Sequence, residues 1–160
     1  ARKPGIIKPL PYSAEQLAVV RSGMDRVVNG NGTAVASRLP LEGIKLAGKT
    51  GTAQVRGLAS GSRGQGGTRR YRDHGLFVCY APTENPRYAA AVIIEHGMGG
   101  ARAAAPVAKD IFTYLYDREK AMAALTALET QWGGTIAERM ARGFAAFQGG
   151  PIITDQDDVP

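Results

Sequence analysis

The chain has 160 residues, of which 44% are hydrophobic and 21% charged, and its formal net charge is +6. This composition is typical of a globular protein. No apolar run approaches the roughly 20 residues that a membrane-spanning helix needs, so any signal or anchor is expected upstream of the chain. The single cysteine, Cys79, excludes an internal disulfide and is expected to be a packed thiol.

The first predicted element is a helix that begins after a proline-containing lead-in over residues 1 to 12. Ser13 followed by Gln16 is a capping-box pattern, which marks the N-terminus of a helix. Apolar residues at helical spacing then predict a face that belongs to the core: Leu17, Val20, Met24, Val27 and Val28. The Asn-Gly-Asn-Gly run over 29–32 is expected to end the helix, although it is also compatible with the tight turn of a hairpin.

Strands are predicted next, over residues 44 to 55, 75 to 81 and 88 to 95. The last two are apolar runs separated by turn residues, so they are expected to pair as an antiparallel hairpin. Residues 56 to 72 are rich in glycine and arginine and contain almost no apolar residue. This segment is interpreted as a long mobile loop.

Helices are predicted over the last third of the chain. Residues 103 to 120 have a helical pattern, with Pro106 tolerated in the first turn. Two Ala-rich helical stretches follow, near 121 to 131 and 135 to 147. The acidic tail after Gly149 is expected to be disordered.

The segment 43–50, Gly-Ile-Lys-Leu-Ala-Gly-Lys-Thr, matches the G-x-x-x-x-G-K-[ST] pattern of a phosphate-binding loop. Such a loop follows a buried strand and opens a helix whose N-terminus receives the phosphates. Here the residues before the match, 38 to 42, read Arg-Leu-Pro-Leu-Glu, and a Gly-rich loop follows it. A nucleotide site is therefore not the interpretation that we favour.

The same residues make a different site when they are interpreted as a strand. A period of two places Lys49 and Gly51 on one face and Thr50 and Thr52 on the other, so a ligand along an exposed sheet edge can reach both. An ammonium, hydroxyls and a bare backbone side by side suit a carboxylate-bearing acyl substrate. The alternative is an ordinary strand whose Lys and Thr side chains face water.

Several segments agree in order with one enzyme family. They are Gly23-Met24 with Val27-Val28 and Gly32-Thr33-Ala34, the block 47–55, Arg72-Asp73-His74 before a strand ending Tyr80-Ala81-Pro82, and Asn85-Pro86 before the strand over 88 to 95. The chain resembles, over about residues 6 to 120, the C-terminal part of the transpeptidase domain of class B penicillin-binding proteins, and most of all the penicillin-binding protein 2 group. Lys-Thr-Gly is one of the motifs of that family.

The resemblance implies an α+β fold of the serine β-lactamase and D,D-transpeptidase type, in which helices pack on an antiparallel sheet. The chain is expected to be a partial domain. Residues 1–120 would be the C-terminal portion of the transpeptidase domain, 121–148 an Ala-rich helical extension and 149–160 an acidic disordered tail.

The resemblance also implies an activity on cell-wall stem peptides. A serine is acylated by a D-Ala-D-Ala donor, and an acceptor amine then resolves the ester to form the crosslink; β-lactams resemble the donor. Lys49 would assist proton transfer, Thr50 and Thr52 would hold the substrate carboxylate, the backbone N–H of Thr52 would be half of an oxyanion hole, and Gly51 would leave room for the substrate. No cofactor is implied. The implied partners are stem peptides, β-lactams and cell-elongation membrane proteins, and the implied location is the periplasm, as a domain of an inner-membrane-anchored protein.

The family also needs Ser-x-x-Lys and Ser-x-Asn, and neither motif occurs in this sequence. The nucleophile and its base are therefore expected upstream, and this chain alone is expected to be inactive. Two alternatives stay open, namely part of a serine β-lactamase-type hydrolase and a non-enzymatic module that binds a partner at its sheet edge. A piece cut from a sheet would also expose apolar surface, so homo-oligomers of the isolated chain are expected.

Two weaker patterns complete the sequence. The Arg- and Gly-rich stretch 67–72 resembles RNA-binding tails, but it is short and bounded by two strands, so nucleic acid is not expected as a partner. Its charge would instead steer anionic peptidoglycan. His74 and His96 lie at the ends of neighbouring predicted strands, which is a weak metal pattern, and no metal is expected.

Overall fold

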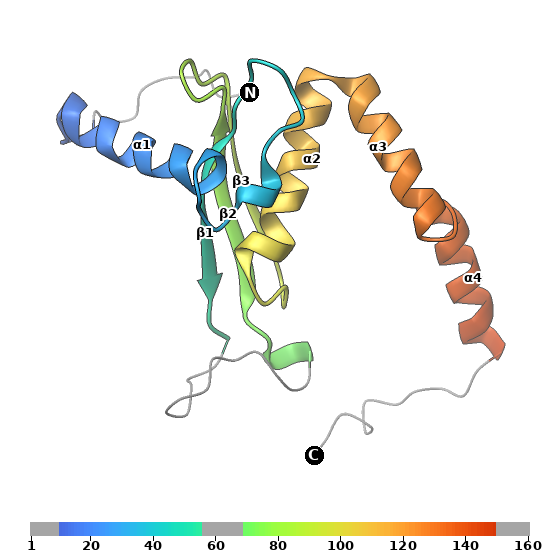
Figure 1. Ribbon diagram of the computed structural model, residues 1–160. Helices are drawn as coiled ribbons and strands as arrows, with labels where there is room; N and C mark the ends of the chain where they lie inside the picture. The colour runs from blue at the N-terminus through green and yellow to red at the C-terminus, as the bar shows by residue number, and fades with distance from the viewer. Residues whose placement is uncertain (1–9, 56–68, 150–160) are drawn as a thin grey trace, which may run out of the picture.

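The computed structural model describes residues 10–55 and 69–149, in which three strands form one antiparallel sheet in the order β1-β2-β3 (Figure 1). The strands are β1 (Ala47–Ala53), β2 (His74–Ala81) and β3 (Tyr88–Ile94). All the predicted strands are confirmed, as is the hairpin of the last two, while β1 begins later and ends earlier than expected. Within the described residues β1 pairs on one side only, with β2, and is therefore an edge strand.

The first helix, α1 (Ala14–Asn29), begins with the predicted capping box. The Ser13 hydroxyl accepts a hydrogen bond from the Gln16 N–H, and the Gln16 side chain accepts one from the Ser13 N–H. The prediction of a buried face along the whole helix was wrong, because Val28 is fully buried whereas Val20 is 58% exposed. Figure 1 shows the reason: α1 meets the sheet with its C-terminal end, and its first turns extend beyond it.

One face of the sheet is covered by α2 (Ala105–Tyr116), which follows a single π-helical turn, Gly100–Ala104. Helical structure therefore starts earlier than the expected residue 103. Phe112 of α2 and Phe77 of β2 are both buried in one apolar cluster, and burying large apolar side chains is what holds a helix on a sheet. This cluster is the core of the described chain.

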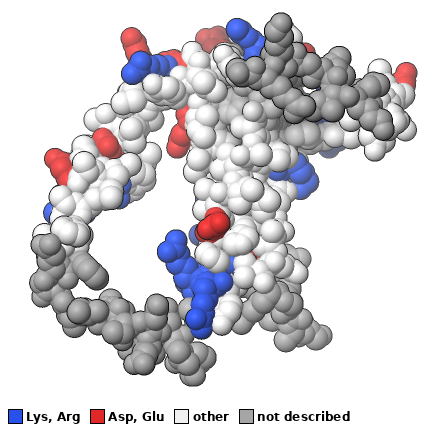
Figure 2. Space-filling model, turned by 180° about the vertical axis from the view of Figure 1, so that it is seen from behind, with Lys and Arg blue, Asp and Glu red and all other residues white. Residues whose placement is uncertain are grey.

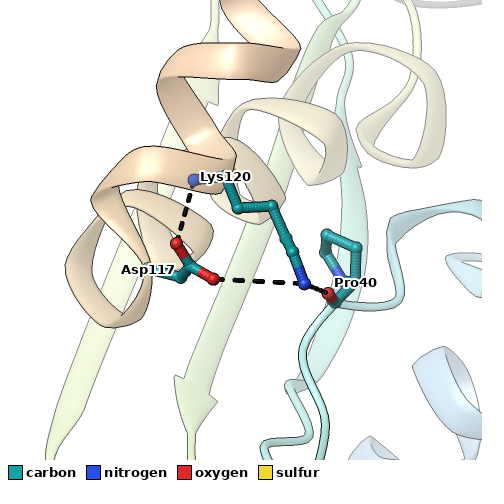
Figure 3. A network of polar contacts seen from close by, with 3 residues as sticks. All are labelled: Pro40, Asp117 and Lys120. Atoms are coloured by element: carbon teal, nitrogen blue, oxygen red, sulfur yellow. Dashed lines mark hydrogen bonds and ion pairs between the residues drawn. The ribbon is translucent and has the colours of Figure 1, made fainter.

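The expected helix over 103 to 120 breaks at Asp117, so the predicted boundary was wrong. The Asp117 side chain caps α3 (Arg118–Gln131) by accepting a hydrogen bond from the Lys120 N–H at 2.9 Å (Figure 3). The Lys120 ammonium also donates to the Pro40 carbonyl at 2.9 Å and lies 4.0 Å from the Asp117 carboxylate. An Asp at this position satisfies a free N–H of the new helix, so the chain turns here instead of continuing.

The last helix, α4 (Ile136–Gly149), continues from α3 and forms with it an arm that stands clear of the sheet (Figures 1 and 2). Gly133 and Gly134 join the two helices with positive φ angles of 80° and 119°, which glycine adopts without strain. The helices expected near 121 to 131 and 135 to 147 are thus present. Among the described residues no helix is both long and apolar enough to span a membrane.

The side chains on the two faces of the sheet differ in how far they are exposed to solvent. Cys79 points to the α2 face and is only 3% exposed, and its burial raises the pKa of the thiol to about 11, which confirms a packed thiol. On the opposite face Val78 and Ile93 are 47% and 62% exposed. Seen from behind, much of the central column carries no charge, and basic side chains gather near its lower end (Figure 2).

Some of the sequence predictions concern residues that lie outside the described part of the chain. Most of the expected mobile loop, residues 56–68, lies outside the described residues, as do most of the lead-in and the acidic tail. The described end of that loop is not irregular, because Arg69–Tyr71 forms a short 3-10 helix.

Candidate substrate-binding groove

An open groove of about 630 Å³ runs along β1 on the α2 face of the sheet. One wall is formed by Thr50, Gly51 and Thr52 of β1, together with Thr33 from the segment after α1. The other wall is the segment 97–103, which includes most of the π-helical turn. The groove therefore joins parts of the chain that are far apart in sequence.

Strand alternation decides which side chains reach this groove. Thr50 lies opposite Phe77, which is fully buried on the α2 face, so Thr50 and Thr52 point to that side. Gly48 shares the same face, and a Cβ atom there would lie 2.3 Å from Cζ of Phe77. Gly48, which directly precedes the Lys-Thr-Gly motif, is thus required by core packing.

Gly51 has no such packing role. A Cβ atom at Gly51 would meet only Cβ of Leu76, at the ordinary contact distance of 3.4 Å. Packing inside the described chain therefore does not require glycine at this position.

Thr33 is a groove residue that the sequence did not single out by itself. Its Oγ1 lies 2.9 Å from Oγ1 of Thr50, so the two hydroxyls are hydrogen-bonded. The preceding Gly32 packs against α1 so closely that a Cβ atom would lie 2.3 Å from Cα of Val27. The signal for Thr33 was its position in the Gly-Thr-Ala block shared with the resembling family.

Lys49 lies on the opposite face of β1 and is not among the residues that line the groove. Its side chain is exposed, and Nζ donates a hydrogen bond to the Thr50 carbonyl at 2.8 Å. Of the predicted site residues, the structure therefore brings Thr50, Gly51 and Thr52 together in one groove, while the Lys49 ammonium lies along the strand backbone.

The second wall packs directly on the sheet backbone at Gly100. A Cβ atom at this position would lie 2.0 Å from the Leu76 carbonyl oxygen and 2.7 Å from that of Gly51. No side chain fits in that space, so glycine allows the π-helical turn to sit beside β1. π-Helical turns occur frequently at functional sites.

Polar contacts at the end of the sheet hold this second wall in place. The backbone carbonyl of Asp73 accepts a hydrogen bond from the Met98 N–H at 2.8 Å. The side-chain carboxylate of Asp73 accepts one from the Val55 N–H at 3.3 Å. The His96 N–H donates to Nδ1 of His74 at 3.0 Å, and the two rings lie 5.0 Å apart. The two histidines thus connect the start of β2 to the segment that follows β3. The described residues hold no cluster of three or more metal-ligating side chains.

Comparison with known proteins places this chain in a family. Residues 1–113 match the family model of the penicillin-binding protein transpeptidase domain. The chain is 43% identical over 109 residues to the peptidoglycan D,D-transpeptidase MrdA of Acinetobacter baumannii, covering 66% of this chain and 16% of that protein. The MrdA protein of Haemophilus influenzae is 37% identical over 97 residues, with 59% of this chain and 15% of that protein covered. The chain thus spans about a sixth of these relatives.

Solved structures agree with the sequence match. Penicillin-binding protein 2 of Pseudomonas aeruginosa, in complex with WCK 5153, superposes with a TM-score of 0.54 and 35% identity over 74% of this chain and 24% of that chain. Penicillin-binding protein 2 of Helicobacter pylori, in complex with MreC, gives a TM-score of 0.54 and 31% identity over 69% of this chain and 19% of that chain. The predicted α+β fold, as a partial domain, is thereby confirmed. The chain belongs to the penicillin-binding protein transpeptidase family and, within it, to the penicillin-binding protein 2 type.

Proposed function

We propose that the protein containing this chain is a peptidoglycan D,D-transpeptidase, which crosslinks cell-wall stem peptides through a serine acyl-enzyme. The observation that carries the proposal is the groove along the edge strand, lined by Thr50, Gly51 and Thr52. The relatives from A. baumannii and H. influenzae, which are named peptidoglycan D,D-transpeptidases, support it. The activity is assigned to a longer protein, because the chain has no Ser-x-x-Lys or Ser-x-Asn motif.

The proposed reaction has two steps. A serine oxygen, supplied by residues outside this sequence, attacks the carbonyl carbon of the penultimate D-Ala, the bond to the terminal D-Ala breaks, and the leaving amine takes up the serine proton. An acceptor amine then attacks the ester carbonyl, and the serine oxygen leaves and regains a proton. Both steps pass through an oxyanion that hydrogen-bond donors must stabilise.

This chain supplies one wall of that site. Thr50 and Thr52 are assigned to the substrate carboxylate. A hydroxyl has one donor and two acceptor positions, so Thr50 can accept the bond from Thr33 and still donate to a carboxylate. The Thr52 backbone N–H is assigned to the oxyanion, Gly51 to close pairing of the substrate with β1, and Lys49 to proton transfer near the nucleophile.

We also propose a cellular location and a protein partner for the enzyme. The protein acts as a periplasmic domain anchored in the inner membrane, where its stem-peptide substrates and β-lactam inhibitors are found. A cell-elongation membrane protein is proposed as its partner, because the H. pylori relative forms a complex with MreC. Acyl transfer of this kind requires no cofactor.

The isolated chain is proposed to self-associate. Val78 and Ile93 expose apolar surface on the sheet face opposite α2, and exposed apolar surface drives association. Light scattering at increasing concentration should show dimers or larger species, and a monomer at every concentration would contradict this proposal.

The proposed function is tested by intact-mass spectrometry after incubation with benzylpenicillin, on this chain and on the full open reading frame that contains it. An adduct on the longer protein alone is expected. No adduct on either would favour the sheet-edge binding module, and rapid turnover of the drug without lasting adduct would favour a β-lactamase-type hydrolase. An adduct on this chain alone would contradict the assignment of the nucleophile to another part of the protein.

A further inference from the structure

The groove contains one charged side chain that has no role in the reaction proposed above. Among the described residues that line it, Arg102 on the 97–103 wall is the only one that carries a charge. The remaining lining residues are glycines, alanines, threonines and one methionine. A single cation in a groove of small neutral groups dominates the electrostatic preference of that groove for its ligand.

Arg102 is exposed and has no hydrogen-bond, ion-pair or ring partner in the part of the chain that the structure describes. Other arginines are engaged. The Arg38 guanidinium donates to the carbonyls of Val28, Asn29 and Gly30 at 2.9 to 3.1 Å, and the Arg118 guanidinium lies 5.5 Å from the ring centre of Tyr114. Arg102 therefore keeps all its N–H donors available for a ligand.

The backbone that presents Arg102 is fixed. Gly100 and Ala104, two residues on either side, are both buried, and Gly100 is wedged against the sheet backbone. The Ala103 N–H donates to the Gly99 carbonyl at 3.0 Å, which closes the turn. A cation held on an anchored turn loses less conformational freedom on binding than one on a free loop, so it can contribute to affinity.

We propose that Arg102 is a carboxylate-binding residue of the groove, which acts on the acyl donor together with the threonine hydroxyls of β1. A guanidinium pairs with a carboxylate through two parallel hydrogen bonds, and the carboxylate oxygens retain lone pairs for a hydroxyl from the opposite wall. Arg102 thereby makes the groove specific for donors that carry a negative charge. This inference rests on the proposed function, because it assumes that the acyl donor occupies this groove.

The test compares two donors that differ only in charge, benzylpenicillin and its uncharged methyl ester, on the full protein that contains this chain. The second-order rate constant of acylation is measured for the wild type, Arg102→Gln, Arg102→Lys and Arg118→Gln. Arg118 is the matched control, since it is an arginine outside the groove.

With benzylpenicillin, the rate constant of Arg102→Gln should fall about 10- to 100-fold, which is the range expected for a charged hydrogen bond. Arg102→Lys should fall less, because an ammonium keeps the charge but not the planar fork. Arg118→Gln should stay at the wild-type rate, and the methyl ester should react equally with all four proteins.

An equal fall of Arg102→Gln with both donors would assign Arg102 a structural role and overturn the inference. An unchanged rate with benzylpenicillin would overturn it too. A wild-type protein that neither donor acylates would instead overturn the proposed function, so the two failures are distinguishable.

Discussion

The hydroxyl of Thr33 lies 2.9 Å from the hydroxyl of Thr50, and this hydrogen bond ties the segment after α1 to the edge strand β1. The Asn29 side chain makes a second tie, donating to the Leu46 carbonyl at 2.9 Å just before β1 begins. Helix α1 therefore has a direct part in placing the groove wall, although most of its length lies outside the core.

Thr33→Val should weaken the groove wall while keeping the shape of the side chain. The lost hydrogen bond is exposed to solvent, so the free energy of unfolding should fall by no more than about 1 kcal/mol. The acylation rate of the full protein should fall as well, because the Thr50 hydroxyl loses the partner that orients it. Thr33→Ser keeps the hydroxyl and is the control; equal rates for the two variants would argue against an orienting role.

Thr52→Val tests the assignment of the second threonine. Its hydroxyl is assigned to a charged carboxylate, and a hydrogen bond to a charged group contributes about 1.5–3 kcal/mol, which corresponds to a loss of about 10- to 100-fold in acylation rate. Thr52→Ser should retain most of the rate. If valine and serine at this position reacted alike with benzylpenicillin, the carboxylate role of Thr52 would be wrong.

Gly48→Ala should destabilise the chain by about 1–3 kcal/mol, because the new methyl group would overlap the buried ring of Phe77. Gly23→Ala is the matched control. It lies inside α1 with no atom within 4 Å of the added Cβ, so it should stabilise the helix by about 0.5–1 kcal/mol. Urea denaturation followed by circular dichroism measures both, and midpoints that move in the same direction would contradict the packing argument.

Asp117→Ala should fray the start of α3 and cost about 1 kcal/mol, since it removes the acceptor for the Lys120 N–H. Asp117→Asn should restore most of this stability, because an asparagine oxygen caps a helix equally well. Hydrogen exchange of the first α3 amides reports the effect locally. Equal protection in the alanine variant and the wild type would show that the cap is dispensable.

The buried thiol of Cys79 should make the free energy of unfolding depend on pH in the alkaline range. Burial raises the pKa of its thiol to about 11, above the ordinary value of 9.0 that applies to the unfolded chain. The unfolded thiol therefore loses its proton first, so this contribution is constant below about pH 9 and is lost as the pH rises towards 11. Cys79→Ala should show a smaller fall in unfolding free energy between these two pH values, and a parallel fall in both proteins would refute the prediction. The native thiol should also react slowly with thiol reagents at pH 8.

The sequence by itself determined the features that depend on near neighbours. The capping box at Ser13 and Gln16, the apolar runs of β2 and β3, and the Lys-Thr-Gly strand can each be recognised within a few residues. Alternation along a strand also predicts, from the sequence alone, that Lys49 lies on the opposite face from Thr50 and Thr52. The Asp117 cap was equally local, because an Asp followed by a Glu in the first turn of a helix, here Glu119, marks a helix start. The helical periodicity on both sides of Asp117 obscured this signal.

Only the tertiary structure decided which surfaces meet. Helical periodicity marks an apolar face along α1, but burial depends on what lies opposite, and β1 meets only the C-terminal end of the helix. The second groove wall, with Gly100 against Gly51 and Arg102 facing the groove, brings together residues about 50 positions apart. No local pattern records such a contact, because it arises from the packing of β1, β2 and the π-helical turn on one another.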